Sequence, residues 1–235
     1  MNEYKNFSSY FDTIMDFLDY NDWINFTKDN IKEGSTILDL ACGSGIFLVN
    51  MNLYGYKTDG LDLSSQMIDL AKDKTYINHI ICNLYEQNMV DFKIDKKYDC
   101  ITCYFDSINH LNSIEEVKEM FLNVYNHLNA GGYFLFDVFS YSRFLEADKT
   151  DISEDFEDFS YRWKMNIELP NTLHHDITIS GLDNFEEKYD EHYYDYKELI
   201  KETHFKKIKV VGDFNKHLYK NSERILVVLQ KKDEI

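Results

Sequence analysis

An acidic residue directly before a glycine-rich turn is the part of this 235-residue sequence with the clearest chemical meaning. Asp39 lies in an apolar run over residues 37–40, and Gly43-Ser44-Gly45 follows before apolar residues resume at 46–49. This pattern predicts a buried strand, a tight loop and the start of a helix, an arrangement that lets a ligand approach backbone N–H groups. A dinucleotide-binding loop would place a third glycine at Leu48, and a pyrophosphate gains nothing from a carboxylate at the strand end. The loop therefore favours a nucleoside with a cationic tail.

Four further segments follow along the chain, each of which combines a predicted strand with an adjoining loop, turn or helix. A second predicted strand ends at Asp62, roughly 20 residues after Asp39, the offset at which an acid meets ribose hydroxyls in Rossmann-type sites. The helix after it would present Met67. The remaining segments are Glu86–Phe92, Tyr98–Ser107 and Leu128–Asp137, read as a strand end with its loop, a strand with its exit, and a glycine turn with a strand.

These five segments resemble, in order, the motifs of class I (Rossmann-like) S-adenosylmethionine-dependent methyltransferases, in the small-molecule branch. The resemblance implies an α/β fold with a seven-stranded, mostly parallel sheet, helices on both faces and a small antiparallel β insertion after strand five. It implies S-adenosyl-L-methionine as cofactor. The residues that it places around the cofactor are Tyr10, Tyr20, Asp39, Ala41, Cys42, Gly43, Ser44, Gly45, Asp62, Leu63, Met67, Asn88, Met89, Cys103 and Tyr104.

The expected cofactor contacts differ in chemistry. Asp62 is expected to accept from ribose hydroxyls, and Asp39 to orient the glycine loop and the ammonium group. Asn88 stands where the family usually has Asp, and its side-chain carbonyl can accept from the adenine amino group as an Asp would. Asn83 is the rival alignment for this position.

Two tyrosines near the start resemble those that fold over the methionine end of the cofactor. An aromatic face beside a sulfonium is favourable by roughly 0.5–2 kcal/mol. Tyr10 and Tyr20 lie in a segment with helical apolar spacing over residues 8–30, which predicts two helices covering one side of the site. The alternative is that both are core residues of those helices.

The pattern changes after residue 140. The acidic run over 146–158 is read as a solvated loop or lid. Alternating segments over 161–168, 173–180 and 185–192, with turns between them, predict antiparallel hairpins. We therefore expect a methyltransferase domain over 1–145 and 193–235, with an insertion over 146–192 that forms the roof of the substrate pocket.

A general base is needed if the acceptor is an alcohol or a protonated amine. His192, in Asp190-Glu191-His192, is the first candidate, because this stretch resembles the acid-acid-His segment that closes the insertion in several small-molecule members. His110 is the second candidate. The alternative for His192 is a histidine satisfied on the face of the sheet.

Two apparent metal motifs have ordinary explanations. Cys100 and Cys103 fit C-x-x-C but lie in one predicted strand, where residues three apart point to opposite faces. His174-His175-Asp176 lies on a hairpin strand with no identified distal partner. We expect no metal.

Composition narrows the partners. The formal net charge of −17 opposes nucleic-acid binding. The sequence has no apolar run long enough for a membrane span and no recognisable leader, and its four cysteines form no paired framework. These features predict a cytoplasmic monomer or homodimer that acts on a small molecule.

The predicted function is methyl transfer to a small-molecule acceptor, an amine or a hydroxyl, by in-line displacement that depends on proximity and orientation. Two alternatives stay open at this stage. One is an NAD(P)-dependent oxidoreductase, against which the missing third glycine and Asp39 argue. The other is a catalytically inactive cofactor-binding protein.

Overall fold

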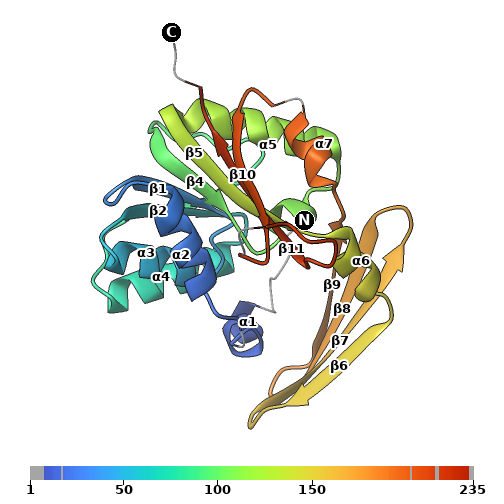
Figure 1. Ribbon diagram of the computed structural model, residues 1–235. Helices are drawn as coiled ribbons and strands as arrows, with labels where there is room; N and C mark the ends of the chain where they lie inside the picture. The colour runs from blue at the N-terminus through green and yellow to red at the C-terminus, as the bar shows by residue number, and fades with distance from the viewer. Residues whose placement is uncertain (1–7, 17, 202, 215–216, 233–235) are drawn as a thin grey trace.

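The computed structural model describes residues 8–16, 18–201, 203–214 and 217–232. Its larger sheet has seven strands in the order β10-β11-β5-β4-β1-β2-β3 (Figure 1). These strands are β1 (Thr36–Leu40), β2 (Lys57–Asp62), β3 (Leu84–Glu86), β4 (Tyr98–Cys103), β5 (Leu128–Phe139), β10 (Lys206–Gly212) and β11 (Arg224–Gln230). Only β11 runs antiparallel to its neighbours. The seven-stranded, mostly parallel sheet expected from the sequence is thus confirmed.

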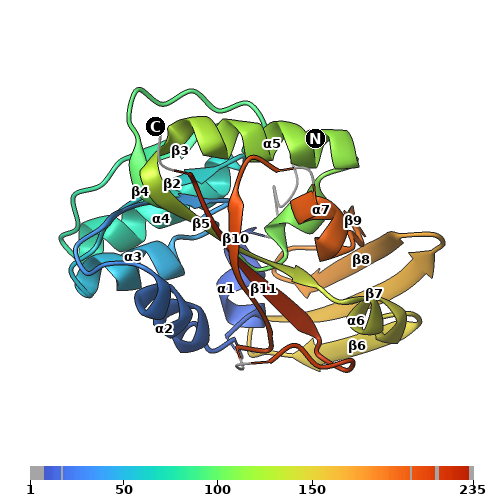
Figure 2. The ribbon, with the colours of Figure 1, turned by 45° about the horizontal axis from the view of Figure 1, so that its top comes forward.

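Helices cover both faces of this sheet (Figures 1 and 2). The helices of the described ranges are α1 (Ser8–Ile14), α2 (Asn21–Asn30), α3 (Ile46–Leu53), α4 (Ser65–Ile77), the 3₁₀ turn η1 (Ser107–His110), α5 (Ile114–His127), α6 (Tyr141–Glu146) and α7 (Tyr196–Lys201). The apolar stripe of α5 and Leu199 of α7 pack on one face, and Trp23 of α2 with Phe47 of α3 pack on the other. None of the helices in the described ranges has the length and apolar character needed to cross a membrane.

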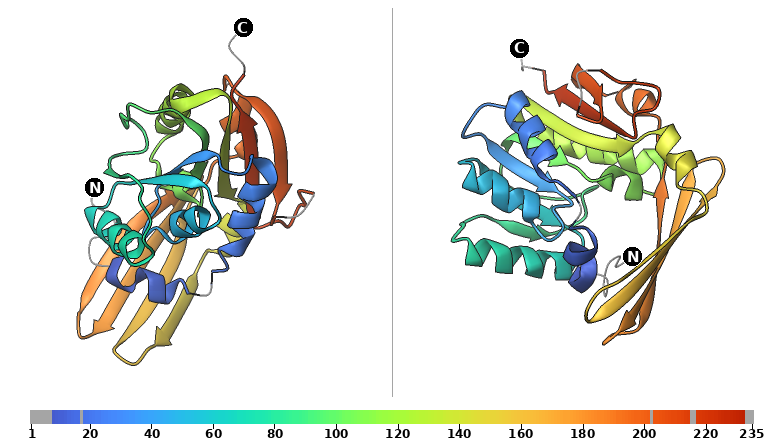
Figure 3. Two further views of the ribbon diagram at one scale, coloured as in Figure 1. Left: turned by 90° about the vertical axis from the view of Figure 1, so that its left-hand side faces the viewer. Right: turned by 60° about the horizontal axis from the view of Figure 1, so that its bottom comes forward.

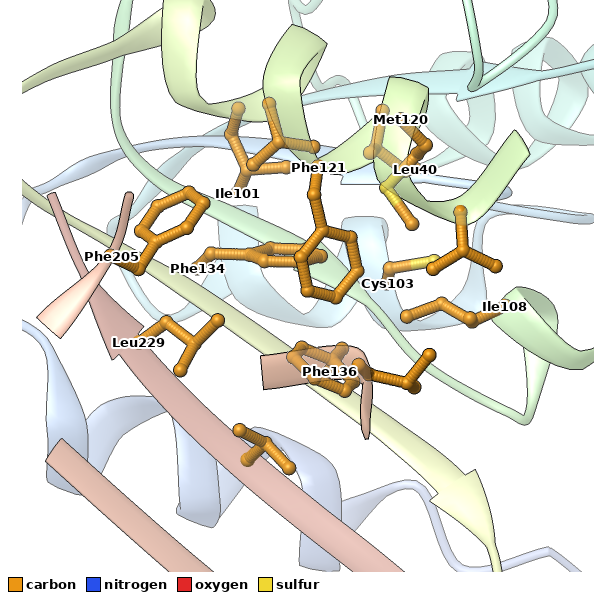
Figure 4. Close-up of a cluster of buried hydrophobic side chains, with 14 of the residues drawn as sticks. Leu40, Ile101, Cys103, Ile108, Met120, Phe121, Phe134, Phe136, Phe205 and Leu229 are labelled. Carbon is orange, nitrogen blue, oxygen red and sulfur yellow. The ribbon is translucent and has the colours of Figure 1, made fainter. Parts of the chain in front are cut away.

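The core on the α5 face is rich in phenylalanine. Figure 4 shows Phe121 of α5 against Phe134 and Phe136 of β5, with ring centroids 5.3 and 5.4 Å apart. Cys103 lies in this cluster, whereas Cys100 belongs to the cluster on the opposite face. The two cysteines therefore point to opposite sides of β4, as alternation along a strand requires.

The second sheet is antiparallel and has the order β6-β7-β8-β9. Its strands are β6 (Thr150–Asp155), β7 (Phe159–Glu168), β8 (Thr172–Gly181) and β9 (Phe185–His192). Figure 3 shows it as an extended sheet beside the α/β layer, with α1 between the two. Ile14 of α1 packs against Tyr161, Ile177 and Ile179 of this sheet. The three predicted hairpin strands are present.

The prediction of a loop over residues 146–158 was wrong in part. Residues 150–155 form β6, which pairs with β7 along its whole length although most of its side chains are exposed. Arg162 of β7 donates two hydrogen bonds to Asp151 across this pair, at 2.7 and 2.6 Å. An edge strand gains its structure from its neighbour's backbone, so its own sequence shows no apolar alternation.

Candidate active site

The strand order reverses direction between β1 and β4, which places a crevice at the carboxyl ends of these two strands. A cavity of about 600 Å³ opens there. Its floor comes from the ends of β1, β2 and β4, one wall from α1, and its roof from β7, β8 and β9. The cavity therefore joins the methyltransferase-like motifs to the insertion.

The backbone conformations in the glycine loop explain why glycine stands at positions 43 and 45. Gly43 and Gly45 have φ of +54° and +82°, and Gly45 precedes α3 as its N-cap. A Cβ on Gly45 would lie 3.0 Å from the Cβ of Ala71 in α4, so this glycine also permits close packing of α3 on α4. The loop is thereby held against β2 and α4 with Gly43 facing open space.

Asp39 lies at the floor of the cavity, where its carboxylate is almost fully buried. Thr102 of β4 donates a hydrogen bond of 2.7 Å to its Oδ1. Burial raises the pKa of Asp39 to about 7, the Thr102 hydrogen bond opposes this shift, and the charge of Asp62 adds to it. A buried carboxylate without a cation gains most from a ligand that brings positive charge.

Asp62 connects the second strand to the glycine loop. Its Oδ2 accepts from the backbone N–H of Gly43 at 2.8 Å, and its Oδ1 accepts from the N–H of Ser64 at 2.9 Å. Burial raises the pKa of Asp62, and these backbone donors counteract it. Each carboxylate oxygen has a second lone pair that can accept from a ligand hydroxyl.

The cavity wall near β3 distinguishes between Asn88 and Asn83, the two candidates for the adenine contact. Asn88 lines the cavity, and its Oδ1 accepts from the N–H of Val90 at 2.9 Å, which leaves its side-chain NH₂ and a second lone pair for a ligand. Asn83 instead bonds to Asp59 with both its backbone and side-chain N–H groups and is not among the lining residues. The structure thus favours Asn88.

Twelve of the fifteen predicted cofactor residues lie together on the cavity wall: Tyr20, Asp39, Ala41, Cys42, Gly43, Ser44, Asp62, Leu63, Met67, Asn88, Met89 and Tyr104. Gly45 lies behind them and shapes the loop. Cys103 is fully buried in the core beneath β4 and does not reach the cavity (Figure 4).

Tyr10 also lies elsewhere. Its hydroxyl donates to Asp183 at 2.6 Å, and its ring packs on Phe159 and Phe185 at the end of the insertion. Tyr20, in contrast, lines the cavity and packs on Phe105 with a centroid distance of 4.8 Å. Tyr20 thus lies on the cavity wall, whereas Tyr10 attaches α1 to the insertion.

His192 does not line the cavity. Its Nδ1 is 3.3 Å from Thr172 Oγ1, on the face of the sheet that carries Asp190 and His174. Neighbouring residues of a strand point to opposite faces, so the residue of this stretch that reaches the cavity is Glu191. We correct the sequence-based choice accordingly: His110 lines the cavity and His192 does not.

Sequence reasoning missed a partly buried ionic cluster at the exit of β4. Arg224 of β11 donates to both carboxylate oxygens of Asp106, at 2.8 and 2.9 Å, and to Asp137 of β5 at 2.9 Å. Trp23 also donates to Asp137, at 2.6 Å. Burial raises the pKa of Asp106 to about 6, against the effect of Arg224. No local sequence pattern could have predicted this cluster, because its residues come from four separate segments of the chain.

The roof contributes a second polar group of residues. Glu191 lies 3.2 Å from Nε2 of His175 and 3.4 Å from Nε2 of His110. His175 stacks on Tyr189 with centroids 4.4 Å apart. The alternation along β8 and β9 could have indicated these inward-facing residues, had the register of the strands been known.

The donor set fits a nucleoside with an amino-acid tail. The cavity offers a carboxylate for ribose hydroxyls at Asp62, a buried carboxylate near the glycine loop at Asp39, and an amide for a base at Asn88. In the described ranges, no group of three or more His, Cys, Asp or Glu side chains could hold a metal ion.

Comparison with known proteins decides the family. Residues 11–183 match the family described as a methyltransferase domain. The chain belongs to the methyltransferase family. A putative methyltransferase of Geobacillus sp. (strain WCH70) is 29% identical over 97% of this chain and 99% of its own length. The oxidoreductase alternative is thereby set aside.

Two further relatives bear on cofactor and acceptor. The crystal structure of an S-adenosylmethionine-dependent methyltransferase from Clostridium acetobutylicum ATCC 824 aligns with a TM-score of 0.85 and 27% identity, covering 97% of this methyltransferase and 99% of that chain. S-adenosylmethionine is the cofactor of this methyltransferase. The dTDP-3-amino-3,4,6-trideoxy-alpha-D-glucopyranose N,N-dimethyltransferase of Streptomyces venezuelae is 28% identical over 47% of this chain and 45% of its own length.

Proposed function

We propose that this methyltransferase transfers the methyl group of S-adenosylmethionine to the nitrogen of a small-molecule amine. The observation that carries the proposal is the charge around the acceptor side of the cavity. Two carboxylates, those of the fully buried Asp137 and the partly buried Asp106, bind the single guanidinium of Arg224, and the partly buried carboxylate of Glu191 interacts with its charge. The other arginine on the cavity wall, Arg143, is exposed to solvent. A site with excess buried negative charge favours a cationic acceptor such as an ammonium.

An uncharged hydroxyl acceptor would gain little from this charge. An ammonium would enter with favourable electrostatics and then lose a proton to become a nucleophile. The similarity to the amino-sugar N,N-dimethyltransferase of Streptomyces venezuelae supports a nitrogen acceptor on a small molecule.

The cofactor would occupy the side of the cavity formed by β1, β2 and the glycine loop. Asp62 would accept from the ribose hydroxyls, Asn88 would contact the adenine, and Asp39 would compensate the charge of the amino-acid tail. Tyr20 would lie beside the sulfonium, where an aromatic face is favourable. The bound cofactor supplies an already activated methyl group, so the protein's tasks are alignment, exclusion of water and removal of one proton.

His110 is the proposed proton acceptor. It lines the cavity between the cofactor side and the roof, where its charge acts on both Asp62 and Glu191. The N–H bond of the acceptor ammonium breaks and the proton passes to the imidazole. The electron pair stays on nitrogen, which forms the new N–C bond as the S–C bond breaks and leaves its pair on sulfur.

The test is a methyl-transfer assay with S-adenosylmethionine against pairs of amino sugars and the corresponding neutral sugars. We expect a mass gain of one methyl group on the amine of a pair and none on its hydroxyl counterpart, with His110→Ala at least about tenfold slower near neutral pH. Methylation of hydroxyls in preference to amines would overturn the proposal. Tight cofactor binding without turnover on any acceptor would favour the inactive cofactor-binding alternative.

A further inference from the structure

A chain of four side chains crosses the roof of the cavity. It begins at Trp163 of β7, passes through His175 of β8 and Glu191 of β9, and ends at His110 in η1. The successive contacts are 2.9 Å from Trp163 Nε1 to His175 Nδ1, 3.2 Å from His175 Nε2 to Glu191 Oε2, and 3.4 Å from Glu191 Oε1 to His110 Nε2. The chain connects the insertion to the exit of β4.

The first contact determines the tautomer of His175. An indole N–H can only donate, so Nδ1 of His175 must be the acceptor and carry no proton. The remaining ring proton is then on Nε2, from which it is donated to Glu191. His175 therefore acts as a fixed, neutral donor to one carboxylate oxygen and does not neutralise the charge of Glu191.

Glu191 is held in its ionised form by its surroundings. The hydrogen bond from His175 and the charge of Arg224, with the charge of His110 when its ring is protonated, keep the pKa of Glu191 below its usual value in spite of burial. With Oε2 occupied by His175, Oε1 is directed to His110. A buried carboxylate beside an imidazole stabilises the imidazolium and fixes the ring orientation.

We propose that Glu191 is a positioning residue for His110, and that Trp163 and His175 hold it in place. This inference rests on the proposed function, because it concerns the group that receives the acceptor's proton. When the proton passes to His110, the new positive charge lies beside the Glu191 carboxylate, and it disappears when the proton is released to solvent. A roof strand would thus supply part of the acid–base machinery along with the shape of the pocket.

Other groups also face His110. Asp62 of β2 interacts with it from the cofactor side, His192 of β9 interacts from the other face of the roof, and the ring of Tyr189 lies 5.4 Å away. Asp106 precedes η1 but is bound to Arg224. Among these groups Asp62 and Glu191 are the two that favour a charged imidazole, and Glu191→Gln removes only the second of these charges.

The test is the titration of the histidine ring nitrogens by ¹⁵N NMR, with full-length protein saturated with S-adenosylhomocysteine. In Glu191→Gln the titration midpoint of His110 should fall by about one pH unit, because an opposite charge within about 4 Å is removed. In wild type, His175 should show the Nε2–H tautomer alone. Glu116→Gln is the matched control, because Glu116 also lines the cavity but caps Asn112, and the His110 midpoint should not move.

A second variant covers the case in which Glu191→Gln does not fold. Trp163→Phe retains a ring but removes the donor to His175 Nδ1, so His175 should lose its single tautomer and the His110 midpoint should fall by a smaller amount. An unchanged His110 midpoint in both variants, or a His175 protonated at Nδ1 in wild type, would overturn the inference.

The result separates this inference from the proposed function, because no acceptor is present in the titration. A shifted midpoint in Glu191→Gln supports the positioning role even if no amine is found to accept a methyl group, and in that case the proposed function alone fails. With an acceptor in hand, Glu191→Gln should move the acidic limb of the kcat/KM profile as the NMR midpoint moves.

Discussion

Asp106 and Arg224 are 118 residues apart in sequence and form a bidentate ion pair at the exit of β4. The guanidinium also bonds to Asp137, which is fully buried, and stacks over Trp23 at 5.1 Å from the ring centroid. The pair joins β11 to the β4 exit, and both residues line the cavity. It fixes the position of Asp106, whose φ of +60° is uncommon for a residue other than glycine.

Removal of this guanidinium should destabilise the fold. Arg224→Ala leaves the buried carboxylate of Asp137 and the partly buried carboxylate of Asp106 without this cation, and we expect a loss of about 3 kcal/mol in the free energy of unfolding at pH 7.5 by urea denaturation. Arg224→Lys should lose less, since it keeps the charge but not the paired geometry.

The same variant should show a pH dependence with a defined sign. Burial raises the pKa of Asp106 in the folded state to about 6, above its ordinary value of 3.8, so protonation at lower pH relieves the unpaired charge. The deficit of Arg224→Ala relative to wild type should therefore shrink between pH 7.5 and pH 5. A deficit that grows as the pH falls would contradict the assigned role of Asp106.

Cofactor affinity should depend on pH through Asp39. Its pKa of about 7 means that the carboxyl group of the free protein takes up a proton as the pH falls below 7, whereas the ligand's ammonium requires the carboxylate. Binding of S-adenosylhomocysteine should weaken by up to about tenfold per pH unit below pH 7. Calorimetry in buffers of different ionisation enthalpy should detect proton release. Asp39→Asn should bind more weakly at pH 8 and show a flatter profile, and an unchanged slope in this variant would assign the titration to another group.

Two glycine substitutions separate backbone strain from steric contact. Gly45→Ala combines a φ of +82° with a Cβ placed 3.0 Å from Ala71, whereas Gly55→Ala has a φ of +89° and no atom within 4 Å. We expect a loss of about 1 kcal/mol for Gly55→Ala and about twice that for Gly45→Ala. Thermal unfolding of both variants tests this, and equal losses would show that α4 yields to the added methyl group.

The two N-terminal tyrosines should behave differently in cofactor binding. Tyr20→Leu removes the aromatic face on the cavity wall, so the preference for S-adenosylmethionine over S-adenosylhomocysteine should fall by about 2- to 30-fold. Tyr10→Phe removes only the hydrogen bond to Asp183 and should leave this ratio within about twofold of wild type. Calorimetric titration with both ligands measures the ratios. A large change in this affinity ratio in Tyr10→Phe would show that Tyr10 contributes to cofactor binding.

The cofactor side of the site could be predicted from the sequence because it depends on local patterns. Asp39, Gly43 and Asp62 lie at the ends of short strand–turn–helix units, in which neighbouring residues determine both the backbone path and the direction of the side chains. The seven-stranded sheet follows from the order of the same units. The prediction of a loop over residues 146–158 was wrong in part, because β6 is stabilised by pairing with β7 and not by its own composition.

The side of the cavity that we propose for the acceptor was decided by the tertiary structure. The register of β8 with β9 turns Glu191 toward the cavity and His192 away from it, and a shift of one residue would exchange the two. The cluster of Arg224 with Asp106 and Asp137 forms only when β11 inserts beside β5. Long-range strand pairing sets these side-chain positions, and no local stretch of sequence contains that information. The sequence thus determined the fold class and the cofactor, whereas the placement of charge on the side of the cavity proposed for the acceptor depended on contacts between distant segments.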